Sequence, residues 1–126
     1  MKSGDSETTL EELKQLVEQF AKERHWKHHH TPKNLAMGIA IEASELMEHY
    51  QWDHQSEPDK EEVADELSDV LFNLLNFAIN ENIDISSSFK SKYKKLQEKY
   101  PTTTFNKEHA DLEEYHRIKK KYREKK

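Results

Sequence analysis

Hydrophobic residues recur every three or four positions in four stretches of the chain, which is the pattern of amphipathic α-helices. The stretches are separated by short polar segments, including a linker at residues 53–57. Glycine and proline are rare, with two and three residues, so the turn signals of a many-stranded protein are missing. The pattern therefore predicts four helices, at residues 9–24, 31–51, 58–80 and 86–100.

Start signals support these helices. Thr9 is followed three residues later by Glu12, which is the spacing of a capping box. Thr31 precedes Pro32, so a capping residue is followed by proline at the first helical position. Acidic residues gather at 57–62, where they complement the dipole of the third helix. Four helices with short connections predict an all-α fold, an antiparallel four-helix bundle.

Composition narrows the class of protein. The chain has 126 residues, of which 33% are hydrophobic, and it contains no cysteine. The length predicts one domain, and the missing cysteines exclude a disulfide scaffold and thiolate metal sites. No apolar run reaches the ~18 residues of a membrane span, and the first residues lack the core of a signal peptide. We therefore expect a cytoplasmic protein that has no membrane partner.

Charge divides the chain into two parts. Residues 117–126 hold seven Lys or Arg and one Glu, a net charge of +6, whereas residues 1–116 have a net charge of −11. We expect a helical domain at residues 1–101 and a polar, basic tail at residues 102–126. An acidic body disfavours nucleic acid as a partner, because affinity for nucleic acid comes largely from neutralising phosphates. It favours divalent cations.

The third predicted helix carries one polar stripe on an otherwise apolar surface. At about 100° per residue, the stripe spans about 80° and begins with Glu66 and Asp69. It continues with three amides, those of Asn73, Asn76 and Asn80. The apolar arc covers about 220°, more than the roughly 100° that a surface helix needs. We therefore expect this helix in the core, and a homo-oligomer that assembles through the second and third helices.

The second predicted helix repeats the carboxylate pair. Glu42 and Glu45 share a face and lie beside apolar positions. If the two pairs meet in a bundle, four carboxylates converge, and either a cation is present or their pKa values rise. Oxygen ligands without cysteine favour Mg²⁺ or Mn²⁺. The simpler interpretation of each single pair is a solvated acidic face.

These motifs resemble those of the MazG-like nucleoside triphosphate pyrophosphohydrolases. The resemblance lies in Glu42-Ala-Ser-Glu45, Gln51-Trp52 and Glu66-Leu-Ser-Asp69-Val-Leu, and residues 24–35 are similar to the dCTP pyrophosphatase branch. It implies a bundle of the all-α NTP pyrophosphatase type, assembled as a homodimer or homotetramer. It also implies Mg²⁺-dependent conversion of an NTP or dNTP and water to the monophosphate and pyrophosphate, with a dCTP-like pyrimidine preference.

The resemblance also assigns roles to individual residues. The metal ligands, which are also the catalytic residues, are Glu42, Glu45, Glu66 and Asp69. The residues that match the base pocket are Trp26, His30 and Trp52. The residues on the side from which the substrate approaches are Lys33 and Asn34. Asn73 stands where the pyrimidine branch carries tyrosine, and it is a further candidate for contact with the substrate.

Three other interpretations stay open. Within the same superfamily, the chain could be a phosphoribosyl-ATP pyrophosphatase. It could instead be a non-enzymatic helical protein that binds nucleic acid through the basic tail, or a structural oligomer whose acidic pairs hold a metal without turnover. For an enzyme, the sequence leaves open whether Glu45 or Glu48 orients the attacking water.

Overall fold

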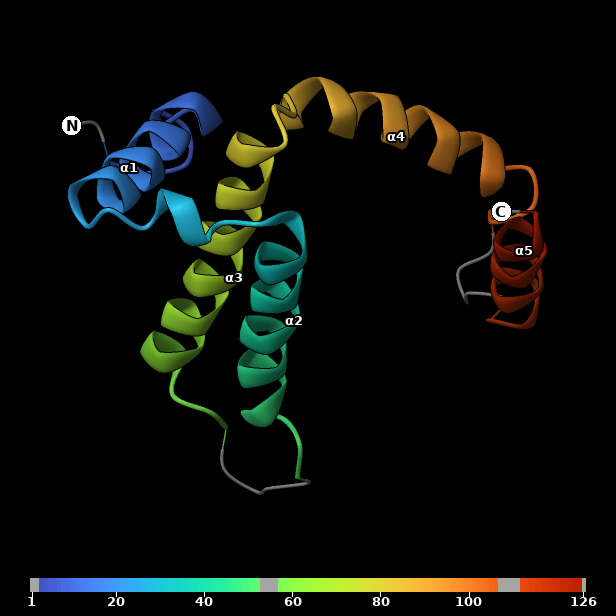
Figure 1. The fold of residues 1–126 in the computed structure, drawn as a ribbon. Helices are drawn as coiled ribbons and strands as arrows, with labels where there is room; N and C mark the ends of the chain where they lie inside the picture. Colours follow the sequence, from blue (N-terminus) through green and yellow to red (C-terminus); the bar gives the residue numbers. More distant parts are fainter. Residues whose placement is uncertain (1–2, 53–56, 107–111, 126) are drawn as a thin grey trace. The chain divides into compact units, whose positions relative to one another are not determined.

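The computed structural model describes residues 3–52, 57–106 and 112–125, and in them it contains helices but no strand (Figure 1). The helices are α1 Leu10–Glu23, the short 3₁₀ helix η1 Lys27–His29, α2 Pro32–Glu48, α3 Lys60–Asn80, α4 Ile85–Lys99 and α5 Leu112–Glu124. The predicted all-α class is confirmed. Most of the predicted polar linker, residues 53–56, lies outside the described residues.

Side-chain caps set the beginnings of three helices. The Thr9 hydroxyl accepts a hydrogen bond from the backbone N–H of Glu12 at 3.1 Å, and the Thr31 hydroxyl accepts one from Asn34 at 3.1 Å. Asp59 caps α3, where its carboxylate accepts bonds from the two N–H groups of residues 61 and 62. Each cap satisfies backbone donors that have no partner within the helix, so the sequence signals for these starts are physical ones.

Two helices end at residues with left-handed backbone. His25 follows α1 and Asn82 follows α3, and both have φ of 55°. Beyond each, a backbone N–H reaches back over the last turn, from Trp26 to the Ala21 carbonyl at 3.0 Å and from Ile83 to residue 78 at 2.8 Å. This closure is the Schellman type, which usually employs glycine or asparagine. It stops each helix sharply and turns the chain toward its next element.

The chain forms two compact units, Met1–Ile85 and Ser86–Lys126. In the first unit, α2 and α3 run side by side in opposite directions, and α1 packs against α3 (Figure 1). The buried apolar residues of this unit are Val17, Ala21, Leu35, Leu75 and Ala78. The ammonium group of Lys14 also donates a hydrogen bond to the Ile83 carbonyl at 2.7 Å, which ties α1 to the end of α3. The first unit is therefore built around α3.

The second unit holds α4 and α5 through a small aromatic group. The Tyr100 ring stacks on Tyr115 at 5.2 Å between centroids and meets Phe105 edge-on at 5.6 Å. Ile118 of α5 is buried. The helix in the C-terminal tail is thus anchored by a few aromatic side chains rather than by a long apolar stripe. The division of the chain at residue 101 stays a prediction.

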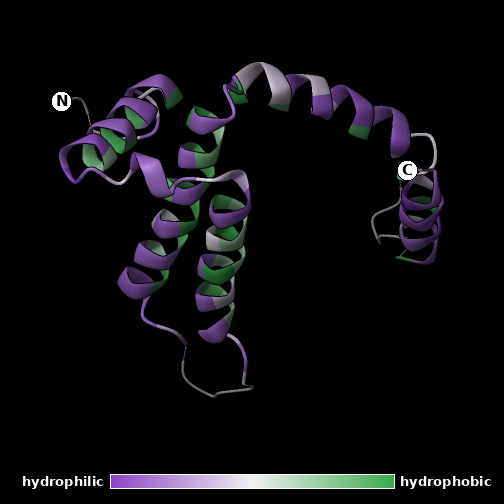
Figure 2. Cartoon of the chain, viewed as in Figure 1, coloured by the Kyte–Doolittle hydropathy of each residue, from purple (hydrophilic) through white to green (hydrophobic). Residues whose placement is uncertain are grey.

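Hydrophobic and hydrophilic residues occupy different sides of α1, α2 and α3 (Figure 2). Several large apolar residues of α2 and α3 nevertheless keep between 39% and 61% of their surface exposed: Met37, Ile41, Met47, Leu67, Leu71 and Leu74. Large apolar residues left exposed in this number on two packed helices are typical of an interface. Among the described residues, no helix has the length and apolar character needed to cross a membrane.

We expect the protein to form a homo-oligomer through this exposed surface of α2 and α3. Light scattering at micromolar concentration should give at least twice the chain mass of 15.0 kDa. Leu67→Glu should weaken assembly, because it places a charge in an apolar contact, whereas Lys60→Glu on the same helix should not. A wild-type mass near that of one chain would contradict the expectation.

Candidate metal centre

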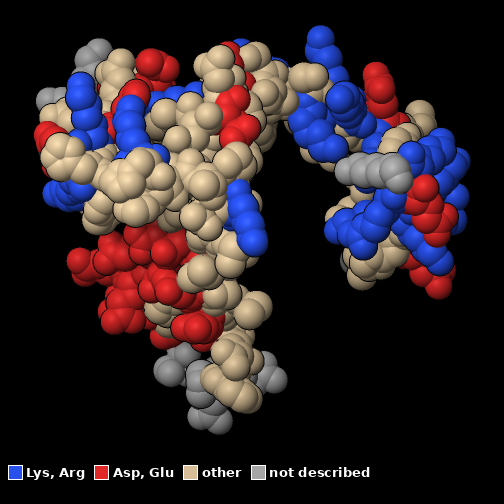
Figure 3. All heavy atoms as spheres, viewed as in Figure 1, with Lys and Arg blue, Asp and Glu red and all other residues tan. Residues whose placement is uncertain are grey.

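Four carboxylates from two antiparallel helices come together in the first unit. Glu42 and Glu45 lie on α2, and Glu66 and Asp69 lie on α3. One carboxylate oxygen of each residue lies within 4.8 Å of those of the other three. The spacing of three residues puts both members of a pair on one helix face, and the packing of α2 against α3 turns the two faces together. Figure 3 shows acidic side chains gathered over this part of the unit.

This arrangement disfavours the charged state of two of the carboxylates. Burial raises the pKa of Glu42, and a hydrogen bond shared with Glu45 and the charges of the other carboxylates add to the rise. Burial also raises the pKa of Glu66, together with the charges of Glu45 and Asp69. The imidazole of His49 acts in the opposite direction on Glu66. Without a cation, the cluster therefore tends to retain protons that isolated carboxylates would lose.

The residues present fit a divalent metal ion. The Oε2 atoms of Glu42 and Glu66 are buried and have no hydrogen-bond partner among the described residues. A buried carboxylate oxygen without a partner is costly, and coordination to a cation would remove that cost. A donor set made of carboxylate oxygens suits hard ions such as Mg²⁺, Mn²⁺ and Ca²⁺. The cluster is therefore able to hold a divalent metal ion.

A histidine stands next to the cluster, and a glutamate considered for catalysis does not belong to it. The Nε2 atom of His49 lies 3.9 Å from the Oε1 atom of Glu66, and both side chains are mostly covered. His49 follows Glu45 by four residues, so its place on the same helix face was visible in the sequence although no role was assigned to it. Glu48 is exposed and is not one of the four clustered carboxylates.

The helices approach each other closely beside the carboxylates. Gly38 lies one turn before Glu42, and a Cβ atom placed on it would stand 2.8 Å from the Oδ1 atom of Asn73. The Asn73 amide nitrogen donates a hydrogen bond to the Asp69 carbonyl at 2.9 Å. The absence of a side chain at position 38 therefore leaves room for the Asn73 amide. Gly38 is therefore, after His49, a second residue beside the cluster for which the sequence alone predicted no role.

The candidate base-pocket residues before α2 belong to a partly covered aromatic region. The Phe20 ring meets Trp26 edge-on at 5.6 Å and Phe72 of α3 at 5.5 Å. Trp26 keeps about half of its surface exposed. The buried Nδ1 atom of His30 has no hydrogen-bond partner among the described residues. Burial lowers the pKa of His30, and the nearby side chains of residues 27–29 lower it further, so the neutral form of its imidazole is favoured.

The remaining predicted substrate residues lie at the two ends of α2. Lys33 is exposed in the first turn. The Asn34 side chain donates a hydrogen bond to the His29 carbonyl at 3.3 Å, so it helps to close the preceding loop. Trp52 follows the other end of the helix and is 66% exposed. The structure thus brings the four carboxylates together and places Asn73 beside them, while Lys33 and Trp52 stand at the surface.

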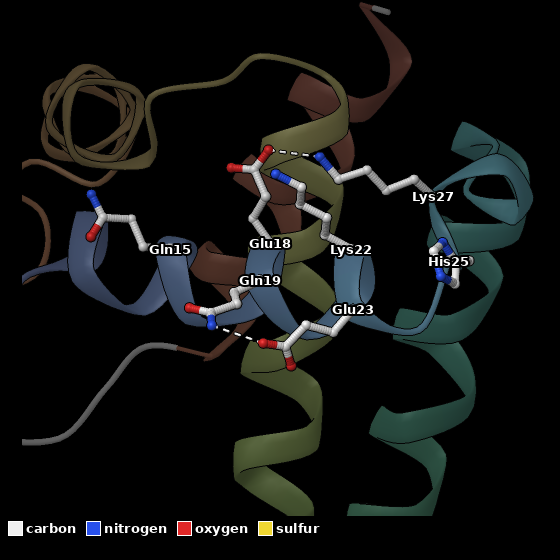
Figure 4. A pocket seen from close by; sticks show the side chains of 7 residues that line it. All are labelled: Gln15, Glu18, Gln19, Lys22, Glu23, His25 and Lys27. Carbon is white, nitrogen blue, oxygen red and sulfur yellow. Dashed lines mark hydrogen bonds and ion pairs between the residues drawn. The ribbon is translucent and has the colours of Figure 1, made fainter.

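A different hollow, of 940 Å³, lies beside α1 (Figure 4). Two pairs of its polar side chains are bonded to each other, since Lys27 donates to the Glu18 carboxylate at 2.8 Å and Gln19 donates to Glu23 at 2.8 Å. The contact with Lys27 lowers the pKa of Glu18. The Lys27 bond ties the segment that follows α1 back onto the helix, whereas the Gln19 bond lies within α1. The hollow contains none of the four clustered carboxylates.

Comparisons with known proteins agree with the predicted family. Residues 37–126 match the model of the MazG-like family. The chain is 37% identical over 107 residues to dCTP pyrophosphatase 1 of Rattus norvegicus and 34% identical to that of Homo sapiens, in each case over 79% of this chain. It spans 63% of the length of these relatives. A crystal structure of a pyrophosphatase from Archaeoglobus fulgidus matches with a TM-score of 0.69 at 37% identity, covering 79% of this chain and 99% of that one.

The raised pKa values of Glu42 and Glu66 predict how stability depends on pH in metal-free protein. Between their ordinary value of 4.5 and the raised values, the folded chain binds more protons than the unfolded chain. This contribution to stability is complete below the ordinary value and is lost as pH rises through the raised values. In EDTA, Glu42→Gln should therefore raise the melting temperature near neutral pH, by about 1–2 °C, and flatten its pH dependence.

Thermal unfolding across this pH range checks the prediction, with Glu48→Gln as the matched control on the same helix. Adding Mg²⁺ near neutral pH should raise the melting temperature of the wild type by mass action, and that of Glu42→Gln less. If the melting temperatures of the wild type and Glu42→Gln instead changed with pH in parallel, the raised pKa of Glu42 would be contradicted.

Proposed function

The chain belongs to the MazG-like family, and on that premise we propose that it is a nucleotide pyrophosphohydrolase of the dCTP pyrophosphatase-like branch. It would convert an NTP or dNTP and water to the monophosphate and pyrophosphate, as a house-cleaning enzyme of the cytoplasm. The observation that carries the proposal is the convergence of four carboxylates within 4.8 Å, with two buried oxygens that have no partner among the described residues. The relatives named dCTP pyrophosphatase support the same reaction.

The proposed metal is Mg²⁺, with Mn²⁺ as the alternative, held by the clustered residues Glu42, Glu45, Glu66 and Asp69. Four carboxylates without a counter-ion would repel a triphosphate, because like charges meet in a partly covered site. When bound, a divalent cation supplies the charge that neutralises the phosphate oxygens and makes a bound water more acidic. The protein contributes a fixed set of oxygen ligands on two packed helices.

Glu45 is the proposed residue for orienting the attacking water. It lies inside the cluster and interacts with both Glu42 and Glu66, whereas the alternative, Glu48, is exposed and outside the four. A carboxylate not fully committed to a metal can accept the proton that water loses as its oxygen bonds to phosphorus. The anhydride linkage between the α- and β-phosphates breaks, and the nucleoside monophosphate and pyrophosphate are released.

The aromatic and amide residues around α2 and α3 are the proposed base-binding groups. The half-exposed Trp26 and the exposed Trp52 can stack on a base, because each base has a π face. The lowered pKa of His30 favours its neutral form, which can both donate to and accept from a base edge. The proposed substrate contacts further include Lys33, Asn34 and Asn73. Asn73 provides an amide donor and acceptor where the branch carries a larger tyrosine, so we propose a dCTP-like preference that is less strict.

Removal of any one clustered carboxylate should abolish turnover without unfolding the protein. The tested variants are Glu42→Gln, Glu45→Gln, Glu66→Gln and Asp69→Asn. Because the metal contributes several kcal/mol to transition-state stabilisation, each should lower kcat/KM at least about 100-fold. Pyrophosphate release with Mg²⁺ measures the effect, and Asp65→Asn on the exposed side of α3 is the control. Near-normal activity in all four variants would contradict the proposal that these carboxylates form the catalytic metal site.

A panel of nucleotides should show dCTP as the best substrate. Trp52→Ala should raise KM for every nucleotide at least about fivefold, because a stacked base contributes about 1–3 kcal/mol. Asn73→Ala should instead change the ranking of the bases, since it removes hydrogen bonds to the base edge. Tyr93→Ala, which removes an exposed aromatic ring in the second unit, serves as the control.

Two results would contradict the base assignment while leaving the metal centre in place. One is turnover of purine triphosphates at least about tenfold better than dCTP, a difference of about 1.4 kcal/mol in transition-state binding. The other is phosphoribosyl-ATP as the best substrate of the panel.

A further inference from the structure

Charge is divided between the two compact units. Residues 86–126 contain 13 Lys and Arg and 6 Asp and Glu, a net charge of +7, whereas residues 1–85 contain 7 and 19, a net charge of −12. The whole-chain value of −5 therefore conceals a strongly basic unit. Figure 3 shows Lys and Arg side chains over much of this second unit. The first unit therefore repels anions, whereas the surface of the second unit attracts them.

Basic side chains of the second unit line a groove between α4 and α5. The groove has a volume of 490 Å³ and is lined by Lys92, Lys95 and Lys99 from α4 and by Lys119, Tyr122 and Arg123 from α5. The α4 lysines are spaced by three and four residues, which puts them on one side of the helix. Among the lining residues, Glu98 alone is acidic. The groove is thus a concave surface with a large excess of cations.

A hydroxyl-bearing hollow extends the groove along α4. This second hollow, of 420 Å³, shares Lys92 and Lys95 with the groove and is also lined by three serines, at positions 87, 88 and 91. From residue 88 to Lys99 the track runs for about 16 Å at 1.5 Å per residue. The triphosphate group of one nucleotide is much shorter than this track. The length of the track therefore fits the phosphates of several linked nucleotides better than those of a single nucleotide.

An aromatic ring completes the surface. Tyr122 is 43% exposed, and the ammonium group of Lys99 lies 4.9 Å from the centre of its ring. Cations and hydroxyls that follow a backbone, with an exposed aromatic ring on which a base can stack, are the elements of sequence-independent single-strand binding. We propose that the groove between α4 and α5 binds the phosphodiester backbone of single-stranded nucleic acid. This binding does not depend on the function proposed for the carboxylate cluster.

Fluorescence anisotropy of the full chain with labelled oligo(dT) and oligo(U) of about 20 nucleotides tests the proposal at about 50 mM KCl and above. The groove variant combines Lys95→Gln, Lys119→Gln and Arg123→Gln. The matched control combines Lys90→Gln, Lys94→Gln and Lys121→Gln, which removes the same total charge from the two helices, two from α4 and one from α5. The control positions point about 160–200° away from Lys92 or Lys119 around each helix. All six side chains are exposed, and circular dichroism checks that both variants keep their helices.

The groove variant should bind at least about tenfold more weakly, and the slope of log K against log salt should fall by about 2, as for three lost phosphate contacts. The control should stay within about threefold of the wild type. Comparable binding of DNA and RNA supports recognition of the backbone, which the two share. Equal losses in both variants, or no oligonucleotide binding by the wild type at about 50 mM KCl, would overturn the proposal. So would complete displacement by inorganic tripolyphosphate at equal phosphate concentration, because the groove would then suit a single nucleotide.

Discussion

The repulsion among four carboxylates is the constraint on which the first unit depends. Glu42 and Glu45 approach Glu66 and Asp69 because packing elsewhere between α2 and α3 holds the helices together. Each of the two helices has a buried leucine at least six residues along the helix from its carboxylates, Leu35 on α2 and Leu75 on α3. Apolar burial therefore holds in place an acidic arrangement that the side chains alone would not adopt. A cation binding there meets ligands that are already assembled.

Helix α3 links this acidic cluster to the proposed base-binding region. One face of α3 carries Glu66 and Asp69, while Phe72, one turn further on, contacts Phe20 of α1. Phe20 in turn contacts Trp26, which begins the segment leading to α2. Helix α3 thus carries two of the residues proposed to hold the metal and, through Phe72 and Phe20, supports Trp26, which is proposed to hold the base. A nucleotide that engages both groups would bind to one continuous framework rather than to two separately mobile parts.

The features that the sequence predicted best are those set by local chemistry. Thr9, Thr31 and Asp59 cap their helices, so three starts could be predicted within about two residues. Helical spacing also placed each carboxylate pair on one face. The proximity of Gly38 and Asn73 could not be predicted, because it depends on how far α2 slides along α3. The position of α5 escaped prediction for a related reason, since a few aromatic contacts between distant residues anchor it.

The close approach at Gly38 couples two positions that are 35 residues apart in the sequence. The Asn73 oxygen lies 2.8 Å from the place where a Cβ atom at position 38 would stand, which is too close for an ordinary contact, so a larger side chain at either position requires the other residue to shift. A bulkier side chain at position 73 must turn away from α2 or push the two helices apart. Pushing them apart would also separate the carboxylates one turn away. In the evolution of such a protein, the base selection proposed for position 73 and the spacing of the proposed metal ligands would be epistatic, and a change of substrate would then require paired substitutions.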